Sequence, residues 1–249
     1  MPSARRLLLV ALVAVAAALA AAAHGAPAGA QPGPAAGKVS FLAGDATRAA
    51  SGRSEALAVG SAVREGDVIE TRRRTRLEIA LADGSLLRLG PNSRVALESA
   101  AFGATPEDRK VTARLAVGAV WATVARAVGG ESRFEVRTAN AVAGVRGTTF
   151  RVDAARDASV VVKVYGGAVA VSAGPVPRPG QAPAKAERKQ VEGPAEVTRE
   201  QWERIVTSMM LVRVSAAGVP AEPEAFALAE AGKDDWEAWN RQRDAKARP

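Results

Sequence analysis

The sequence predicts an all-β domain followed by a smaller helical region at the C-terminus. Between residues 37 and 173, short runs of alternating apolar and polar residues recur between turns rich in glycine and aspartate, a spacing typical of strands in all-β domains. The same span lacks the apolar period of 3.6 residues that marks an amphipathic helix. The chain has 249 residues, which is enough for one or two domains with a substantial core.

Residues 1–30 are predicted to be a secretory signal peptide. Arg5 and Arg6 precede an uninterrupted apolar run over residues 7–23, and small residues suited to cleavage follow it. The run is rich in alanine and short for a membrane span, so we favour cleavage over an uncleaved leader anchored in the inner membrane. We therefore expect a periplasmic mature protein without a stable transmembrane span.

A short linker over residues 31–36 is expected to lead into the β domain, residues 37–173. Its turns are predicted at Gly66-Asp67 and Asp83-Gly84, because glycine and aspartate favour tight turns. Two strands divided at Gly118 are expected within residues 111–124. Further strands are predicted at residues 39–41, 68–71, 77–81, 87–89, 95–97, 134–136, 160–164 and 169–171.

Residues 138–152 are predicted to form one buried, bulged strand. Val145 and Phe150 are five residues apart and would face opposite sides of a regular strand. One additional residue at a bulge would return both to the same apolar face, and glycine is often found at bulges. We therefore expect a bulge at Gly147, with Arg146 and Thr148 beside it.

The C-terminal part is predicted to be a proline-rich linker, residues 174–197, followed by a helical region, residues 198–249. Thr198 and Gln201 have the spacing of a capping box at the start of a first short helix. The apolar residues that would lie on one face of this helix are Trp202, Ile205, Val206, Met209 and Val212.

A second short helix is expected to begin near Asp234, with acidic residues at its start and basic residues towards its end, as the helix dipole favours. Trp236 and Trp239 are three residues apart and share one face of this helix. We expect them to pack back onto the β domain, and the alternative is that they bind a groove on a partner protein.

The composition argues against most enzyme classes. The chain has no cysteine, and its one histidine, His24, lies in the predicted signal peptide, so the mature protein would lack the commonest general bases and nucleophile pairings. We expect neither a metal site nor a cofactor. The formal net charge of +8 is modest, and no nucleic-acid recognition motif accompanies it, so nucleic acid is not an expected partner.

Two groups of basic residues are candidates for binding an anionic ligand, such as an envelope glycan. Arg146, with hydroxyl support from Thr148, either binds an anion at the predicted bulge or fastens the strand internally. If residues 72–76 form a strand, Arg72, Arg74 and Arg76 share one face. That face either binds phosphate or carboxylate groups or is a solvated surface that discourages edge pairing.

Asp67 and Asp83 are the best-placed acids for an alternative function, hydrolysis of an envelope glycan by a carboxylate pair. Each adjoins a glycine in a predicted turn. Aspartate beside glycine is usually turn chemistry, so we expect a structural role and no enzymatic activity.

Several segments, taken in this order, resemble the FecR domain, a module of extracytoplasmic regulators. The resemblance rests on residues 66–71 (GDVIET), 81–85 (LADGS), 115–120 (LAVGAV), 145–150 (VRGTTF) and 164–169 (VYGGAV), and it extends over residues 37–173. Residues 234–244 also resemble tails that follow such domains in some secreted members. The residues that we interpret as structural parts of the motif are Gly66, Asp67, Asp83, Gly84, Gly118, Val145, Gly147, Phe150 and Gly167.

The resemblance implies a rolled-sheet or β-solenoid-like domain that senses or holds partners in the bacterial envelope. We therefore expect a non-enzymatic binding module, acting as a sensor or scaffold, whose partner is an envelope protein or an anionic glycan. Regulators of this family carry a cytoplasmic segment that engages an ECF sigma factor, whereas only six residues precede the apolar run here. Indirect regulation of ECF sigma-factor or iron-type signalling through a membrane partner is the alternative.

Overall fold

The computed structural model describes residues 34–50, 52–103, 109–126, 132–145, 147–174, 203–228 and 233–247. Within these residues the chain forms 17 strands and one α-helix, α3 (Asp235–Ala247), which confirms the predicted all-β fold and the second of the two predicted C-terminal helices. In this part of the chain, no helix is long and apolar enough to cross a membrane. The predicted signal peptide and residues 175–197 of the predicted linker lie outside the described residues.

One group of strands forms a sheet that we call sheet A. Neighbouring strands in this sheet pair antiparallel. In spatial order the strands of sheet A are β4 (Ala62–Val63), β1 (Gly37–Ala43), β6 (Arg76–Leu81), β7 (Leu86–Leu89), the second half of β9 (Lys110–Thr123), β12 (Thr149–Ala154), β13 (Val160–Gly166), β16 (Met210–Val214) and β17 (Glu224–Ala225).

The remaining strands form sheet B, in which one pair, β9 with β10, is parallel and the others are antiparallel. Its strands, in spatial order, are β3 (Arg53–Ala56), β2 (Ala46–Ala50), β5 (Val68–Thr71), β8 (Arg94–Ala101), the first half of β9, β10 (Arg133–Arg137), β11 (Ala141–Val145), β14 (Ala168–Ala173) and β15 (Glu203–Thr207).

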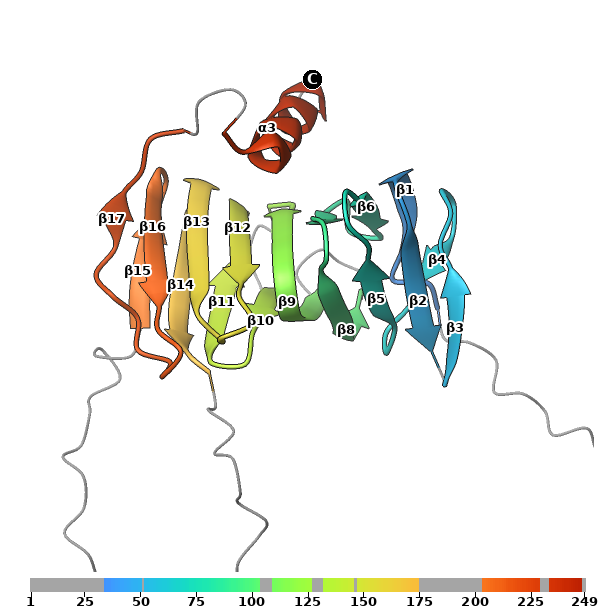
Figure 1. The fold of residues 1–249 in the computed structure, drawn as a ribbon, viewed down its shortest axis with the longest axis horizontal. Coiled ribbons are helices and arrows are strands. Elements are labelled where there is room, and N and C mark those ends of the chain that lie inside the picture. The colour runs from blue at the N-terminus through green and yellow to red at the C-terminus, as the bar shows by residue number, and fades with distance from the viewer. Residues whose placement is uncertain are drawn as a thin grey trace, which may run out of the picture. The chain divides into compact units, whose positions relative to one another are not determined.

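The chain passes repeatedly from one sheet to the other, as expected of a rolled sheet or a solenoid. As a result, strands that are close in the sequence remain close in space, and β1–β4 lie at the opposite end of the strand array from β15–β17 (Figure 1). The strands predicted at residues 39–41, 68–71, 77–81, 87–89, 95–97, 134–136, 160–164 and 169–171 are all present. The hairpin of β2 and β3 is an addition, because its alanine, serine and arginine residues lack a strong strand pattern.

Strand β9 belongs to both sheets. Its first half pairs with β8 and β10 in sheet B, and its second half pairs with β7 and β12 in sheet A. The strand changes sheets at Gly118, whose φ of 99° is one that residues with a side chain rarely adopt. A Cβ atom at this position would lie 2.3 Å from the Oγ of Ser93. The two strands predicted on either side of Gly118 are therefore one continuous strand that bends there.

The apolar residues of the two sheets form a single core. Alternate residues of each strand point into it, so that Val160, Val162 and Val164 of β13 are buried while Lys163 between them faces outward. Val145 of sheet B and Phe150 of sheet A both belong to this core. The polar residues between the core positions of sheet A form its outer face, which α3 contacts.

The prediction of one bulged strand over residues 138–152 is wrong. The segment forms two strands, β11 in sheet B and β12 in sheet A, and the chain turns from one sheet to the other between Val145 and Thr149. Gly147 lies at this corner with a φ of 64°. Val145 and Phe150 do reach the same core, as expected, but they reach it from opposite sheets.

The helix predicted from Thr198 is also wrong for the part that the structure describes. Residues 203–207 and 210–214 form β15 and β16, which extend sheet B and sheet A through pairing with β14 and β13. Ile205 is exposed and Val206 is buried, which is the alternation of a strand rather than the shared face of a helix. Thr198, Gln201 and Trp202 lie outside the described residues.

Candidate functional site

A row of large side chains crosses the outer face of sheet A at right angles to the strands. These residues lie opposite one another on neighbouring strands, as the register of the sheet shows. We call this set the cross-strand row, and it consists of Phe41 on β1, Glu78 on β6, Arg88 on β7, Trp121 on β9, Arg151 on β12 and Lys163 on β13. The row thus combines three cations, one carboxylate and two aromatic rings.

Helix α3 covers the cross-strand row, and Figure 1 shows it on one side of the strands. Near its start, Asp234 and Glu237 contact β12 and β13; towards its end, Arg243 and Asp244 contact β6, β7 and β9. The helix therefore runs across the strands and along the row. It also buries polar side chains that face outward from a sheet: Arg88 is 1% exposed and Glu78 is 5% exposed.

Glu78 accepts hydrogen bonds from both arginines that flank it. The Nε of Arg88 lies 2.6 Å from its Oε2, and the guanidinium of Arg243 on α3 donates to both of its oxygens at 2.9 and 2.8 Å. Ser40 donates a further hydrogen bond at 2.8 Å. Burial raises the pKa of the carboxyl, but these donors outweigh it and bring the pKa of Glu78 to about 2. Glu78 is therefore an ionised anchor for α3.

Asp244 is the corresponding anchor on the helix. Its Oδ1 lies 2.6 Å from Nη1 of Arg88 and accepts a hydrogen bond from the hydroxyl of Thr123 at 3.1 Å. Its Oδ2 accepts a hydrogen bond from the indole nitrogen of Trp121 at 3.0 Å. Trp121 is 1% exposed and satisfies its polar atom through this helix.

A second ionic group holds the start of the helix. The Nη1 of Arg151 lies 2.6 Å from Asp234, whose other oxygen caps the helix by accepting from the backbone N–H of Glu237 at 2.8 Å. The fully buried carboxylate of Glu237 lies 3.4 Å from the ammonium group of Lys163. Burial would raise the pKa of Asp234, but the backbone N–H and Arg151 outweigh it and lower that pKa.

Burial raises the pKa of Tyr165, which stands on β13 two residues beyond Lys163, and the nearby carboxylate of Glu237 adds to this shift. Burial also raises the pKa of Asp153, against the opposing effect of Arg151. These shifts arise from the low solvent access beneath and beside α3.

The two tryptophans of α3 pack on the β domain. The ring of Trp236 makes an edge contact with Trp121 at 6.4 Å between centroids and lies 5.0 Å from the guanidinium carbon of Arg151. The ring of Trp239 lies 5.4 Å from that of Phe41 and is flanked by three guanidinium groups. The rings therefore alternate with cations along the row, an arrangement that favours cation–π attraction.

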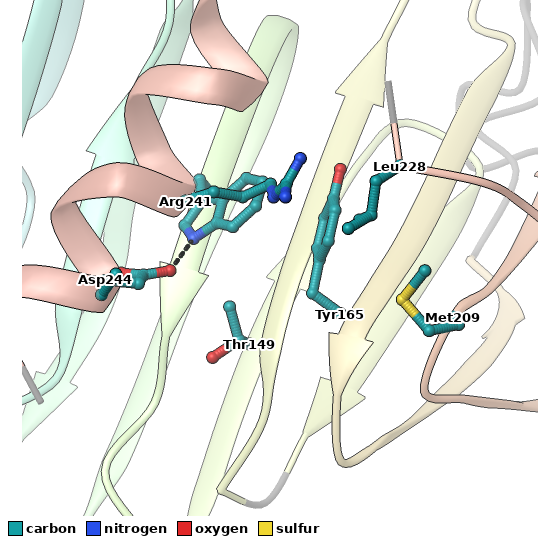
Figure 2. A pocket seen from close by; sticks show the side chains of 8 residues that line it. Thr149, Tyr165, Met209, Leu228, Arg241 and Asp244 are labelled. Carbon is teal, nitrogen blue, oxygen red and sulfur yellow. Dashed lines mark hydrogen bonds between the residues drawn. The ribbon is translucent and has the colours of Figure 1, made fainter. Parts of the chain in front are cut away.

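A pocket of about 210 Å³ lies where α3 meets β13. Figure 2 shows Tyr165 standing between Arg241 of α3 on one side and Leu228 and Met209 on the other. The walls combine aromatic and aliphatic surface with one cation, and Asp244 also lines the pocket, so it suits an apolar side chain near the edge of the covered row.

The candidates at the predicted bulge do not form a site in the described residues. Arg146 lies outside them. Thr148 is buried, and its hydroxyl donates a hydrogen bond to the carbonyl of Ala168 at 2.9 Å, which ties the corner to β14. Gly167 packs against this corner: a Cβ atom there would lie 3.0 Å from the Oγ1 of Thr148.

The strand expected to carry three arginines on one face is wrong. Residues 72–75 form a turn between β5 and β6, with Arg74 at a φ of 63°, and only Arg76 belongs to a strand. Arg72 and Arg74 are exposed on the turn. Arg76 points instead to α3, where its guanidinium carbon lies 5.6 Å from the ring centre of Trp239.

The two aspartates considered for hydrolysis each hold their own turn. Asp67 is buried, and its Oδ2 accepts a hydrogen bond from the backbone N–H of Arg64 at 2.8 Å. Asp83 accepts from the backbone and the hydroxyl of Ser85 at 3.0 and 2.7 Å, and it pairs with the buried Arg109. In the part of the chain that the structure describes, no cluster of acidic side chains could hold a metal ion.

Sequence reasoning missed the cross-strand row as a site. Glu78 and Arg88 each stand between buried apolar residues of their strands, a position that indicates an outer face. What sequence reasoning lacked was the register, which brings these residues opposite Trp121 and Arg151. It also could not show that α3, about 150 residues further along the chain, lies over them. The cross-strand row can therefore bind a helix that carries carboxylates and aromatic rings.

Comparisons with known proteins find similarity in the β region. A family model described as "FecR protein" matches residues 67–170. A search of curated proteins found no match. Two crystal structures of a candidate anti-sigma factor from Parabacteroides distasonis are 17% and 18% identical, with TM-scores of 0.44 and 0.45. Each alignment covers 64% of this chain and 59% of theirs, so the chain spans less than two thirds of their length.

A third solved structure, a cell surface anchoring domain, is 27% identical over 25% of this chain and 83% of its own, with a TM-score of 0.24. The family model covers β6–β9, β12 and β13, which carry every member of the cross-strand row except Phe41. Residues 67–170 of this chain therefore resemble a FecR domain.

Proposed function

We propose that this chain is a non-enzymatic protein-binding module of the bacterial envelope that acts in signalling. The FecR match supports a regulatory, signalling role. The location in the periplasm rests on the predicted signal peptide. The binding role rests on the outer face of sheet A, where the cross-strand row contacts a helical segment.

The observation that carries the proposal is the set of contacts between the cross-strand row and α3. Three cations of the row pair with three carboxylates at distances between 2.6 and 3.4 Å, and two aromatic rings of the row contact two tryptophans. Desolvated arginines next to tryptophan and tyrosine rings are the side chains that dominate the energy of protein–protein interfaces. This face of the FecR domain therefore has the chemistry of a protein-binding surface.

Glu78 and Tyr165, two titratable groups of this face, are suited to binding rather than to proton transfer. Glu78 is held ionised by two arginines and a serine, and the pKa of Tyr165 is raised above its ordinary value. Neither group is brought towards neutral pH, where a general acid or base works best. The aspartates at the turns are occupied by backbone N–H groups and by arginine.

The proposal is tested by crosslinking a tagged full-length protein in intact cells, followed by purification and mass spectrometry. We expect a reproducible envelope protein whose crosslinks map to the FecR domain, and a mature N-terminus near residue 30 in the periplasmic fraction. Capture of glycan alone, or turnover of cell-wall material by the purified protein that is lost in Asp67→Asn or Asp83→Asn, would contradict the proposal.

A further inference from the structure

The helix that covers the cross-strand row lies outside the FecR domain. Five of the six row residues fall within residues 67–170, whereas α3 begins at Asp235. The domain thus presents the row as its own surface, and the chain adds a separate element that occupies it. The side chains through which α3 contacts this surface indicate which kind of segment the surface can bind.

The chemistry of α3 defines that preference. Of its 13 residues, the apolar ones are two tryptophans and three alanines, so the helix is not held by an aliphatic face. A helix of this length is marginal in water, and α3 therefore depends on its docking. What it offers to the row is a pair of aromatic rings three residues apart, the carboxylates of Asp234, Glu237 and Asp244, and the guanidinium of Arg243, which pairs with Glu78.

The fit of α3 to the row is incomplete. The indole nitrogen of Trp236 and the side-chain oxygen of Asn240 are both buried, and neither finds a hydrogen-bond partner among the described residues. Each unsatisfied buried polar atom weakens docking, because it has given up its hydrogen bonds to water. A helix from another protein that satisfies these positions would bind the same face more tightly than α3 does.

Building on the function proposed above, we propose that the cross-strand row is the partner-binding surface and that α3 is its internal competitor. The partner supplies an acidic amphipathic helix with two aromatic side chains three residues apart, and this helix replaces α3. Charge complementarity favours an acidic segment, because removal of α3 takes three carboxylates from beside Arg88, Arg151 and Lys163. It takes one guanidinium, that of Arg243, from beside Glu78. The observed affinity for the partner then equals the intrinsic affinity multiplied by the fraction of molecules in which α3 is undocked.

A labelled peptide with the sequence of residues 233–247 serves as the probe, and its binding to full-length protein is followed by fluorescence anisotropy. Two variants weaken the competitor in different ways: Trp236→Ala with Trp239→Ala removes both rings, and Asp244→Asn removes one ion pair. We expect the peptide to bind the double variant at least about tenfold more tightly than it binds the wild type, with Asp244→Asn in between.

Two controls show whether binding is specific to the row. Adding Arg151→Gln to the double variant should weaken peptide binding about tenfold, and a peptide with Asp234→Asn, Glu237→Gln and Asp244→Asn should bind about as weakly. Circular dichroism establishes that each variant keeps its strands. We call the double variant and Asp244→Asn the opened variants, because each weakens the docking of α3. If both remain folded and bind the peptide no better than the wild type does, the inference is wrong.

Crosslinking in cells separates this inference from the proposed function. We expect the opened variants to capture more of the envelope partner than the wild type, and the peptide to displace it. If a partner is captured equally by all variants and resists the peptide, the inference fails while the proposed function stands. If the peptide binds but no envelope protein is captured by any variant, the proposed function fails, and the external partner inferred here fails with it.

Discussion

Replacing Arg88 with methionine should release α3. Methionine keeps most of the apolar stem but removes the guanidinium, which bonds Glu78 and Asp244 at 2.6 Å each from a position that is 1% exposed. Removing one member of a buried ion pair typically costs about 3–5 kcal/mol. We expect about 3 kcal/mol, the lower end, because Glu78 keeps Arg243 and Asp244 keeps Trp121.

A loss of about 3 kcal/mol corresponds to a roughly 100-fold change in the docking equilibrium. Hydrogen exchange of the α3 amides measures this change directly, because exchange reports local opening. Urea unfolding followed by tryptophan fluorescence gives the accompanying change in the free energy of unfolding. Trp121, Trp236 and Trp239 all lie at the interface, so their emission should shift when the helix leaves.

The matched control is Arg94→Met. Arg94 also sits on a strand and pairs with a glutamate, Glu70, but their side chains are 56% and 38% exposed. Exposed pairs of this kind contribute at most about 1 kcal/mol. Equal losses below about 1 kcal/mol for both variants would refute the reasoning, since the Arg88 pair would then behave as a solvated one.

Two further predictions concern the bend in β9 and the acid side of the pH range. Gly118→Ala should lower the free energy of unfolding, measured in urea, by about 3 kcal/mol or more, because the φ of Gly118 is 99° and the new Cβ would clash with Ser93. The control is Gly144→Ala, whose new Cβ would have its nearest contact at 3.9 Å. It should change the free energy of unfolding by less than about 1 kcal/mol. The pKa of Glu78 is lowered from 4.5 to about 2, so its stabilising contribution should be complete above about pH 4.5 and disappear as the pH falls through 2. Tryptophan emission at constant ionic strength measures the transition, and an unchanged acid transition in Glu78→Gln would contradict this assignment.

The strands of the β region could be predicted from the sequence because one face of each strand is buried. A period of two is visible wherever branched or aliphatic residues alternate with polar ones, as at Leu77, Ile79 and Leu81. The same alternation is consistent with Glu78 and Arg88 on the outer face of sheet A. Local pattern was sufficient here because burial on one side of a sheet is a local property of the strand.

Corners between the sheets could not be distinguished in the same way. Gly118 and Gly147 both interrupt an apolar alternation, yet the strand continues through Gly118 and ends before Gly147. Either geometry returns the chain to the shared core, so the hydrophobic pattern is the same for both. The difference lies in which strands are available for pairing on each side, and this depends on residues far away in the sequence.

The helix predicted from Thr198 failed for a related reason. The spacing of Ile205, Val206, Met209 and Val212 fits a helix, but β14 and β13 offer free edges to the same residues. Pairing with these edges buries Val206 and Val212 in the common core. Such tertiary pairing overrides local propensity, and a single sequence does not reveal it.

The position of β9 in both sheets has a consequence for how the domain responds to load and to binding. One continuous backbone carries hydrogen bonds to four neighbouring strands, two in each sheet. The two sheets therefore cannot separate from each other without breaking hydrogen bonds of β9. A pull on the outer face of sheet A at Trp121 is transmitted through Gly118 to Leu115 of sheet B, so the two sheets should yield together, as one mechanical unit.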